Sequence, residues 1–209
     1  IMAGRMTGSD VQGTFITADT QALDADGIST AAAVGNNAAL TIGGALADGG
    51  SCTFNSGRIV TILSAGDDSS KSFTVVGTDV NSDSQSETIT GANAGTATGS
   101  KYFKTIASIT AVGNPAGNVS AGINNSAADV IFAGRSRLQG LNLVCSGTAG
   151  NVDFLTTSPT GTSLFKLGSV ASATATRDIT IPDNGLLFTS GIYIQYTQST
   201  FGTMTAFYA

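Results

Sequence analysis

The stretch Leu138-Gln-Gly-Leu-Asn-Leu-Val-Cys145 places an apolar side chain at every second position in its second half. A period of two residues is the period of a β-strand with one buried face. Segment 192–196 repeats this pattern, with Ile, Ile and Tyr at alternate positions. Both stretches therefore predict strands that lie on a hydrophobic core.

Comparable short segments recur along the chain between residues that favour turns, such as Gly, Asn and Asp. The earlier group, which we take as a first unit, comprises 11–17, 38–42, 58–64, 72–77, 87–90 and 102–112. The later group comprises 130–133, 138–145, 151–155, 163–167, 178–181, 186–188, 192–197 and 203–208. No stretch has the 3.6-residue period of a helix, so we expect less than roughly a tenth of the residues to be helical.

The length of 209 residues is enough for two β-sandwiches of about 100 residues each. We therefore expect an all-β fold of two β-sandwich or jelly-roll-like domains with little helix. The expected divisions are an N-terminal arm and first strand over 1–24, a β-sandwich domain over 25–124, and a C-terminal β-sandwich domain over 125–209. The boundary near Asn124 follows the Gly- and Asn-rich segment that separates the two groups of strands.

Charge is scarce and slightly negative. Charged residues make up 11% of the chain, against about 25% in an average soluble protein, and the net charge is −5. A negative chain opposes binding to a phosphate backbone, so we expect no nucleic-acid partner. The uncharged run 27–47 is rich in Gly, Asn, Ser and Thr, which argues against a membrane span. Residues 1–10 have no apolar run, and no secretory signal is expected in the sequence as given.

The chain contains no His, so the commonest general base and metal ligand are both missing. We expect no catalytic residue, no cofactor and no enzymatic activity. Ser163-Leu-Phe-Lys166 matches the Ser-x-x-Lys pattern of penicillin-recognising enzymes. The segment is predicted to be a strand, however, where positions three apart point to opposite sides. The match is therefore interpreted as coincidence.

Acidic turns and two cysteines leave two alternatives open. Asp79-x-Asn81-x-Asp83 begins like a calcium loop but lacks the Gly and Glu that complete one, so we expect a hairpin turn and no metal. A weak calcium site in this loop, in 67–68 or in 24–27 remains the alternative. Cys52 and Cys145 lie in apolar stretches and are expected to be buried free thiols, with an interdomain disulfide as the alternative.

The C-terminal segment has no charged side chain after Asp183, yet it carries several large apolar residues. An exposed strand edge of that composition would aggregate, so another element must cover it. The cover is either the first domain of the same chain or a neighbouring copy, and we favour the copy. Phe201, Phe207 and Tyr208 are the candidate interface residues of a homo-oligomer, for which a trimer is expected.

Several stretches resemble virion structural proteins of tailed bacteriophages, particularly those of marine and cyanobacterial phages. They include Arg58-Ile-Val-Thr-Ile-Leu-Ser-Ala-Gly, Phe73-Thr-Val-Val-Gly-Thr-Asp, Lys101-Tyr-Phe-Lys-Thr-Ile-Ala-Ser-Ile and Ile181-Pro-Asp-Asn-Gly-Leu-Leu-Phe. The resemblance implies a β-sandwich protein without catalysis, on the outer surface of the virion. We expect a capsid decoration or cement protein that binds the major capsid protein. A tail or tail-fibre component is the alternative, and a bacterial surface adhesin or sheath subunit is the third possibility.

Overall fold

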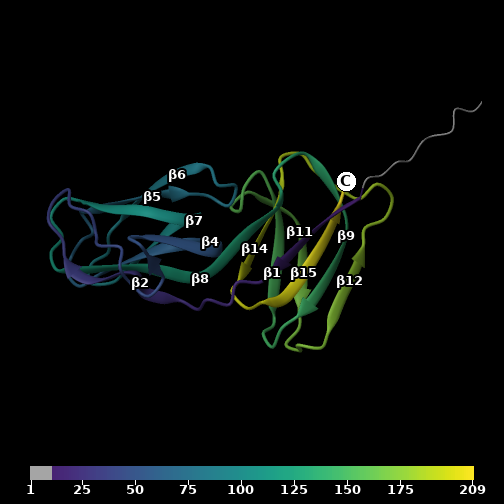
Figure 1. The fold of residues 1–209 in the computed structure, drawn as a ribbon, viewed down its shortest axis with the longest axis horizontal. Helices are drawn as coiled ribbons and strands as arrows, with labels where there is room; N and C mark the ends of the chain where they lie inside the picture. Colours follow the sequence, from purple (N-terminus) through teal and green to yellow (C-terminus); the bar gives the residue numbers. More distant parts are fainter. Residues whose placement is uncertain (1–10) are drawn as a thin grey trace, which may run out of the picture.

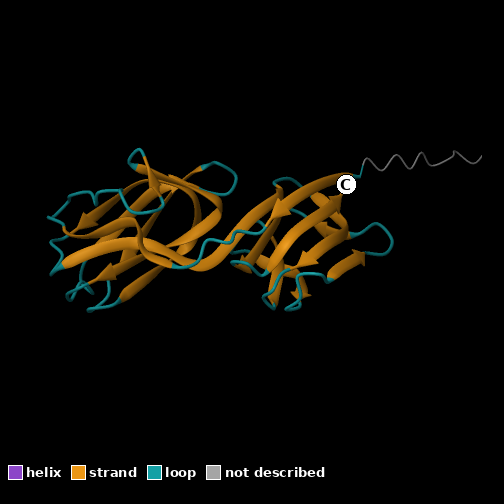
Figure 2. Cartoon of the chain, turned by 60° about the horizontal axis from the view of Figure 1, so that its bottom comes forward, coloured by secondary structure: helices purple, strands orange, loops and turns teal. Residues whose placement is uncertain are grey.

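The computed structural model describes residues 11–209, and expectations for residues 1–10 lie outside this range. The described chain is 64% strand and has no helix, which confirms the all-β expectation. Strands joined by loops form two lobes that lie end to end (Figure 1, Figure 2). No helix in residues 11–209 is long and apolar enough to span a membrane.

Fifteen strands form two antiparallel sheets within the described residues. The first nine are β1 (Gln12–Thr17), β2 (Asp24–Ala33), β3 (Ala47–Asp48), β4 (Ser51–Ser64), β5 (Ser72–Thr78), β6 (Ser84–Thr90), β7 (Thr96–Val112), β8 (Asn118–Phe132) and β9 (Ser136–Cys145). The others are β10 (Gly150–Thr156), β11 (Thr162–Ser169), β12 (Thr176–Thr180), β13 (Leu186–Phe188), β14 (Ile192–Thr197) and β15 (Phe201–Tyr208). The five-stranded sheet has the order β1-β15-β9-β12, with β13 beside β9. The ten-stranded sheet has the order β11-β10-β14-β8-β4-β7-β5-β6, with β2 beside β8 and β3 beside β4.

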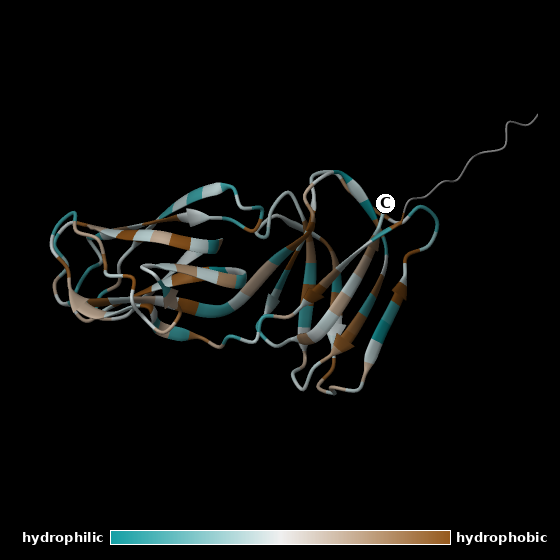
Figure 3. Ribbon diagram, in the orientation of Figure 1, coloured by the Kyte–Doolittle hydropathy of each residue, from teal (hydrophilic) through white to brown (hydrophobic). Residues whose placement is uncertain are grey.

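Each lobe has its own hydrophobic core, and β8 runs through both. Its Val119 and Ile123 pack into the first core, whereas Ala127 and Ile131 pack into the second. The expected boundary at Asn124 therefore falls inside a continuous strand. The two cores are built from apolar residues that alternate along the strands, visible as brown bands in both lobes (Figure 3).

The first predicted strand, 11–17, belongs to the second lobe rather than to the first unit. β1 pairs antiparallel with β15, from Gln12 opposite Tyr208 to Thr17 opposite Thr203. Its Ile16 is part of the second core. The grouping by sequence order was wrong here because antiparallel pairing joins the two ends of the described chain, which sequence proximity does not indicate.

Two further differences concern the first lobe. Segment 38–42 is a loop with one isolated bridge, from Ala39 to Thr110, although Leu40 and Ile42 are buried in the core. Leu40 and Ile42 therefore line the core although their segment is not a strand paired with neighbouring strands on both sides. β2 and the first half of β8 were not predicted, because their Gly, Ala, Ser and Asn residues have low strand propensity. Their pairing with each other compensates for that propensity.

The C-terminal strand is not an exposed edge. β15 lies between β1 and β9, so a strand of the same chain covers the edge that we assigned to a neighbouring copy. Phe201 and Tyr208 are buried and belong to the second core. Only Phe207 of the three candidate interface residues points outward, with 40% of its surface exposed. The expectation of an intermolecular cover over β15 was therefore wrong, and the interface role of Phe207 stays a prediction.

Candidate functional site at the junction of the lobes

A buried ion pair lies where the two lobes meet. Arg58 of β4 has no exposed surface, and its Nη1 is 3.3 Å from Oδ2 of Asp19 in the β1–β2 connection. Nη1 also donates to the carbonyl of Gln21 at 2.9 Å, and Nη2 donates to the carbonyl of Asn124 on β8. One guanidinium thus holds the connection and β8 against β4. Removal of one partner would leave an uncompensated buried charge.

A hydroxyl–carboxyl cluster adjoins this ion pair. Tyr196 Oη of β14 lies 2.9 Å from Oδ2 of Asp129 on β8, and Ser56 Oγ of β4 lies 2.8 Å from the same oxygen. Tyr196 Oη and Ser56 Oγ are 3.0 Å apart. The backbone N–H of Asp19 donates to Tyr196 Oη at 3.1 Å and thereby connects the cluster to the ion pair. Strands β4, β8 and β14 therefore meet in one network.

The number of protons in this cluster depends on Asp129. Three contacts join the two hydroxyl oxygens and the carboxyl oxygen, but the hydroxyls of Ser56 and Tyr196 supply only two protons. When Asp129 is ionised, one of the three contacts has no proton between its oxygens. When Asp129 is protonated, each of the three groups donates one hydrogen bond to another member of the cluster and accepts one from a member. The neutral carboxyl therefore satisfies the cluster better than the carboxylate.

The pKa of Asp129 is also shifted in the direction that favours its neutral form. Burial raises the pKa of Asp129 to about 6, although hydrogen bonds from Ser56 and Tyr196 and the charge of Lys104 oppose this rise. The negative charge of Asp19 adds to the rise. Burial, followed by the charge of Asp129, raises the pKa of the Tyr196 phenol. Asp129 therefore titrates closer to neutral pH than an ordinary carboxyl does.

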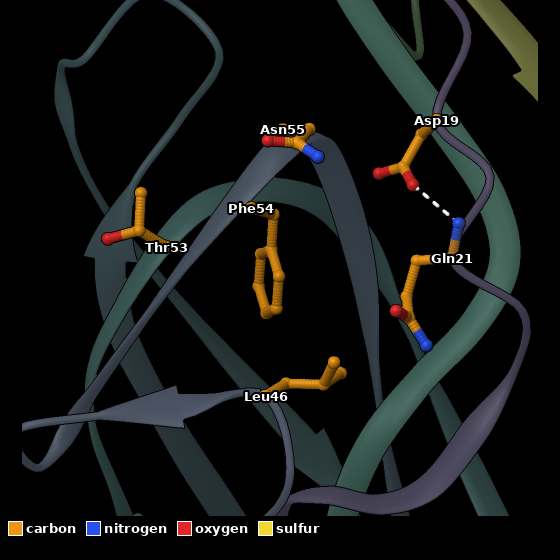
Figure 4. Close-up of a pocket in the computed structure, with 6 residues that line it drawn as sticks. All are labelled: Asp19, Gln21, Leu46, Thr53, Phe54 and Asn55. Carbon is orange, nitrogen blue, oxygen red and sulfur yellow. Dashed lines mark hydrogen bonds between the residues drawn. The ribbon is translucent and has the colours of Figure 1, made fainter.

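A small pocket of about 100 Å³ opens beside the ion pair (Figure 4). Leu46 and Phe54 give it an apolar side, and Asp19 and Gln21 give it a polar side. Both oxygens of Asp19 are engaged, one with Arg58 and the other with the N–H of Gln21 at 2.8 Å. A carboxylate already engaged at both oxygens is a poor general base, so the geometry suits a structural role better than acid–base chemistry.

Ser163 and Lys166 lie on β11, as predicted, but on the same side of it. Ser163 Oγ donates to Oδ1 of Asp153 at 3.1 Å, and Lys166 Nζ lies 3.0 Å from that oxygen. The pairing of β10 with β11 is shifted between Phe154 and Leu155, so Leu164 is an extra residue in β11. A bulge of this kind changes the alternation of side chains, which is why the expectation of opposite sides was wrong. The carboxylate of Asp153 therefore contacts both Ser163 and Lys166.

The three acidic segments adopt different local structures. Oδ1 of Asp79 accepts the N–H groups of Asn81 at 2.8 Å and Asp83 at 3.0 Å, and closes a turn. Asp68 is fully buried and accepts the N–H of Ala116 at 2.7 Å. Segment 24–27 belongs to β2, so its assignment to a loop was wrong. No group of three or more potential metal-ligating side chains occurs within residues 11–209.

The two cysteines are free and buried, as predicted. Cys52 lies in the core of the first lobe and Cys145 in the core of the second. Burial raises the pKa of the Cys52 thiol to about 11. Cys52 therefore acts as a small apolar core residue. Although burial opposes it, hydrogen bonds with the Val170 backbone and Ser169 and the charge of Arg177 lower the pKa of the Cys145 thiol.

Sequence reasoning missed the residues of the junction. Arg58 was noticed only within a strand, although an Arg in an otherwise apolar strand indicates a buried partner. Asp129 follows two Ala and precedes Val-Ile, and such an apolar setting was the available signal for a buried carboxyl. Comparisons of the chain with protein-family models, with curated proteins and with solved structures found no match.

Proposed function

We propose that the chain is a non-enzymatic structural protein of a tailed-bacteriophage particle, with the role of a decoration or cement protein on the outer surface of the capsid. Many copies would bind the major capsid protein of the same phage and one another, after assembly in the host cytoplasm. The proposal combines the resemblance of the strand motifs with the way in which the two lobes are joined.

The junction between the lobes is the observation that carries this proposal. β8 is continuous through both cores, and the Arg58–Asp19 ion pair fastens the β1–β2 connection to β4 and β8. An enzyme that closes its lobes over a substrate needs a hinge between them. A building block needs a fixed shape instead, because its copies must fit repeatedly into one lattice. A junction made of a continuous strand and a buried ion pair therefore supports an architectural role.

The low charge of the chain gives further support. Only two ion pairs occur within the described residues, Arg58–Asp19 in the interior and Lys166–Asp153 at the surface. Weak contacts between uncharged surfaces are adequate when many identical copies bind a shell, since multivalency adds their effects. The same composition would be a poor basis for steering a charged substrate or a nucleic acid.

A tail or tail-fibre component is the second candidate. It is favoured by the end-to-end arrangement of the lobes, which gives the described chain an elongated body (Figure 1). Elongated two-lobe subunits suit a tail as well as the outside of a shell.

Mass spectrometry of phage particles whose genome encodes the chain tests the proposal. Purified particles are separated into heads and tails, and peptides of the chain are quantified relative to those of the major capsid protein. Enrichment in tailless heads is the expected result. Recovery from tails alone would favour the second candidate. Absence from complete particles would contradict both virion roles.

A further inference from the structure

Strand β1 is an edge strand without the usual protection against pairing. Among the described strands it pairs only with β15, at one end of the five-stranded sheet. Three other edge strands carry charge: Glu87 on β6, Lys166 on β11, and Arg177 with Asp178 on β12, where a hydrophilic band is visible (Figure 3). The uncharged edge strand β13 beside β9 is only three residues long. β1, with the sequence Gln-Gly-Thr-Phe-Ile-Thr, has neither charge nor Pro. Charge and Pro are two common means of protecting a natural sheet edge.

The side chains of this edge are also unusually exposed. Phe15 has 65% of its surface exposed, more than any other large apolar side chain in residues 11–209, and Val11 has 48%. Gly13 lies between them on the same face of the strand, since side chains two residues apart point the same way. Phe207 of β15, which pairs with Gly13 and is also partly exposed, extends this apolar surface, and contiguous exposed apolar surface is typical of a contact.

The backbone of β1 offers a regular set of hydrogen-bonding groups at its free edge. The N–H of Ala18 donates to the carbonyl of its opposite residue, Gly202, at 3.0 Å. In an antiparallel pair these bonds alternate between successive residues, so the even-numbered residues of β1 bond β15. The N–H and C=O groups of Gly13, Phe15 and Thr17 therefore point away from β15. Another β-strand can satisfy a row of this kind with regular backbone hydrogen bonds.

We propose that two copies of this chain pair through β1, antiparallel and about a two-fold axis at Thr14, so that their five-stranded sheets become one continuous sheet. A pairing across this edge must match odd-numbered residues with odd-numbered residues. With the axis at Thr14, residue 13 faces 15 and residue 11 faces 17 of the other copy. This register pairs every residue of the range 11–17, that is Val11 and β1, whereas an axis at residue 13 or 15 leaves residues of this range unpaired.

The register places Phe15 of each copy over Gly13 of the other. The chain already uses this arrangement within its own sheet, where Phe207 pairs with Gly13 on one side and Gly140 on the other. A Cβ atom built on either glycine would lie 3.9 Å from the Phe207 ring. Large aromatic rings that cover a glycine on the neighbouring strand stabilise such positions. In the pair, Phe207 and Phe15 of the other copy would flank Gly13 together.

A second copy fits this edge better than an unrelated strand. The net charge of −5 makes two copies repel each other in most relative orientations, but β1 contributes no charge to that repulsion. The sequence of β1 is complementary to itself in the register above, which is the condition for a two-fold contact. This pairing specifies how copies of the proposed structural protein would bind one another. It rests on the proposed function only for the particle in which the dimer would occur. It replaces the expected trimer by a dimer.

Sedimentation velocity of the purified chain over a range of concentrations tests the pairing. The unchanged chain should form a dimer, and Phe15→Lys should raise its dissociation constant at least about tenfold, because it places two like charges beside the axis. Thr17→Pro should also weaken the dimer, since it removes an N–H at the free edge but none that bonds β15. Val76→Lys, a charge on an exposed apolar residue of the other lobe, is the control and should leave the dimer intact.

Hydrogen exchange distinguishes edge pairing from a failure to fold. In the dimer, the amides of Gly13, Phe15 and Thr17 should be protected, and in Phe15→Lys these three should exchange rapidly while β15 stays protected. A chain that is monomeric at every concentration would overturn the proposal. So would a dimer or trimer that persists unchanged in both edge variants. Because these results concern the purified chain, they are independent of whether the chain is found in phage heads.

Discussion

Tyr196 Oη lies 2.9 Å from Oδ2 of Asp129, so a side-chain hydrogen bond joins β14 to β8 in addition to their backbone pairing. Ser56 of β4 lies within hydrogen-bond distance of both groups. All three side chains are close to the point where β8 passes from one core to the other. The proton on Asp129 therefore affects the same region that fixes the two lobes.

The contribution of Asp129 to the free energy of unfolding should increase as the pH falls from about 7 to about 4. Burial raises the pKa of Asp129 to about 6 in the folded chain, from the ordinary 3.8. Between these values the folded chain binds more protons than the unfolded chain. The stabilisation is therefore complete below about 3.8 and is lost as the pH rises through about 6. A shift of this size corresponds to about 3 kcal/mol.

Urea unfolding of the Asp129→Asn variant measures this contribution. The amide is neutral and can donate one hydrogen bond and accept another, as the protonated carboxyl does, so the variant should be more stable than the unchanged chain at about pH 7. Its stability should also depend less on pH. Asp153→Asn, which changes a surface carboxylate, is the control and should keep the original pH dependence. Equal slopes for Asp129→Asn and the unchanged chain would contradict the assignment.

Arg58→Met should destabilise the chain by about 3–5 kcal/mol, because it leaves the Asp19 carboxylate buried without its partner. Lys166→Met removes the exposed ion pair with Asp153 and should cost less than about 1 kcal/mol. Addition of Asp19→Asn to Arg58→Met should recover part of the loss, since the unpaired charge is then removed. Urea titrations of the four chains, followed by far-ultraviolet circular dichroism, provide these values. Similar losses for Arg58→Met and Lys166→Met would contradict a buried role for the first pair.

The alternation of apolar residues was sufficient to predict most strands of the second lobe. Segments 186–188 and 192–197 match β13 and β14 at both ends. The position of β1 beside β15 could not be predicted in this way, because pairing between distant strands depends on the whole fold and not on local pattern. The site was missed for a related reason. Arg58, Asp19 and Tyr196 come from three separate segments, and none of them carries a motif that refers to the others.

Cys52 and Cys145 should be unreactive toward thiol reagents in the folded chain and should both react after unfolding. Each is buried in a different core, where a reagent cannot reach it. The raised pKa of Cys52, about 11, also keeps its thiol protonated at mildly alkaline pH, whereas the pKa of Cys145 is lowered and burial alone protects that thiol. Titration with a chromogenic disulfide should therefore count two thiols in denaturant and essentially none before it. Unfolding midpoints with and without reductant should agree. Failure to find two thiols in denaturant would indicate a disulfide.

Removal of residues 1–17 should cause the chain to aggregate. β1 is the only described strand on that side of β15, so its loss exposes an edge that contains Phe201, Phe207 and Tyr208 but no charge. It also removes Ile16 from the second core. Removal of residues 1–10 is the matched control, because it leaves β1 in place.

Tyrosine fluorescence can follow the damage to the second lobe. The chain has no Trp, and three of its four Tyr residues, Tyr193, Tyr196 and Tyr208, lie in that lobe. The shorter deletion should keep the native emission and remain soluble, whereas the longer one should lose both. This outcome separates protection of β15 within one chain from protection by another copy. If the chain without residues 1–17 stays soluble and folded, then β15 needs no cover, and the argument that an uncharged edge must be paired would fail for β1 as well.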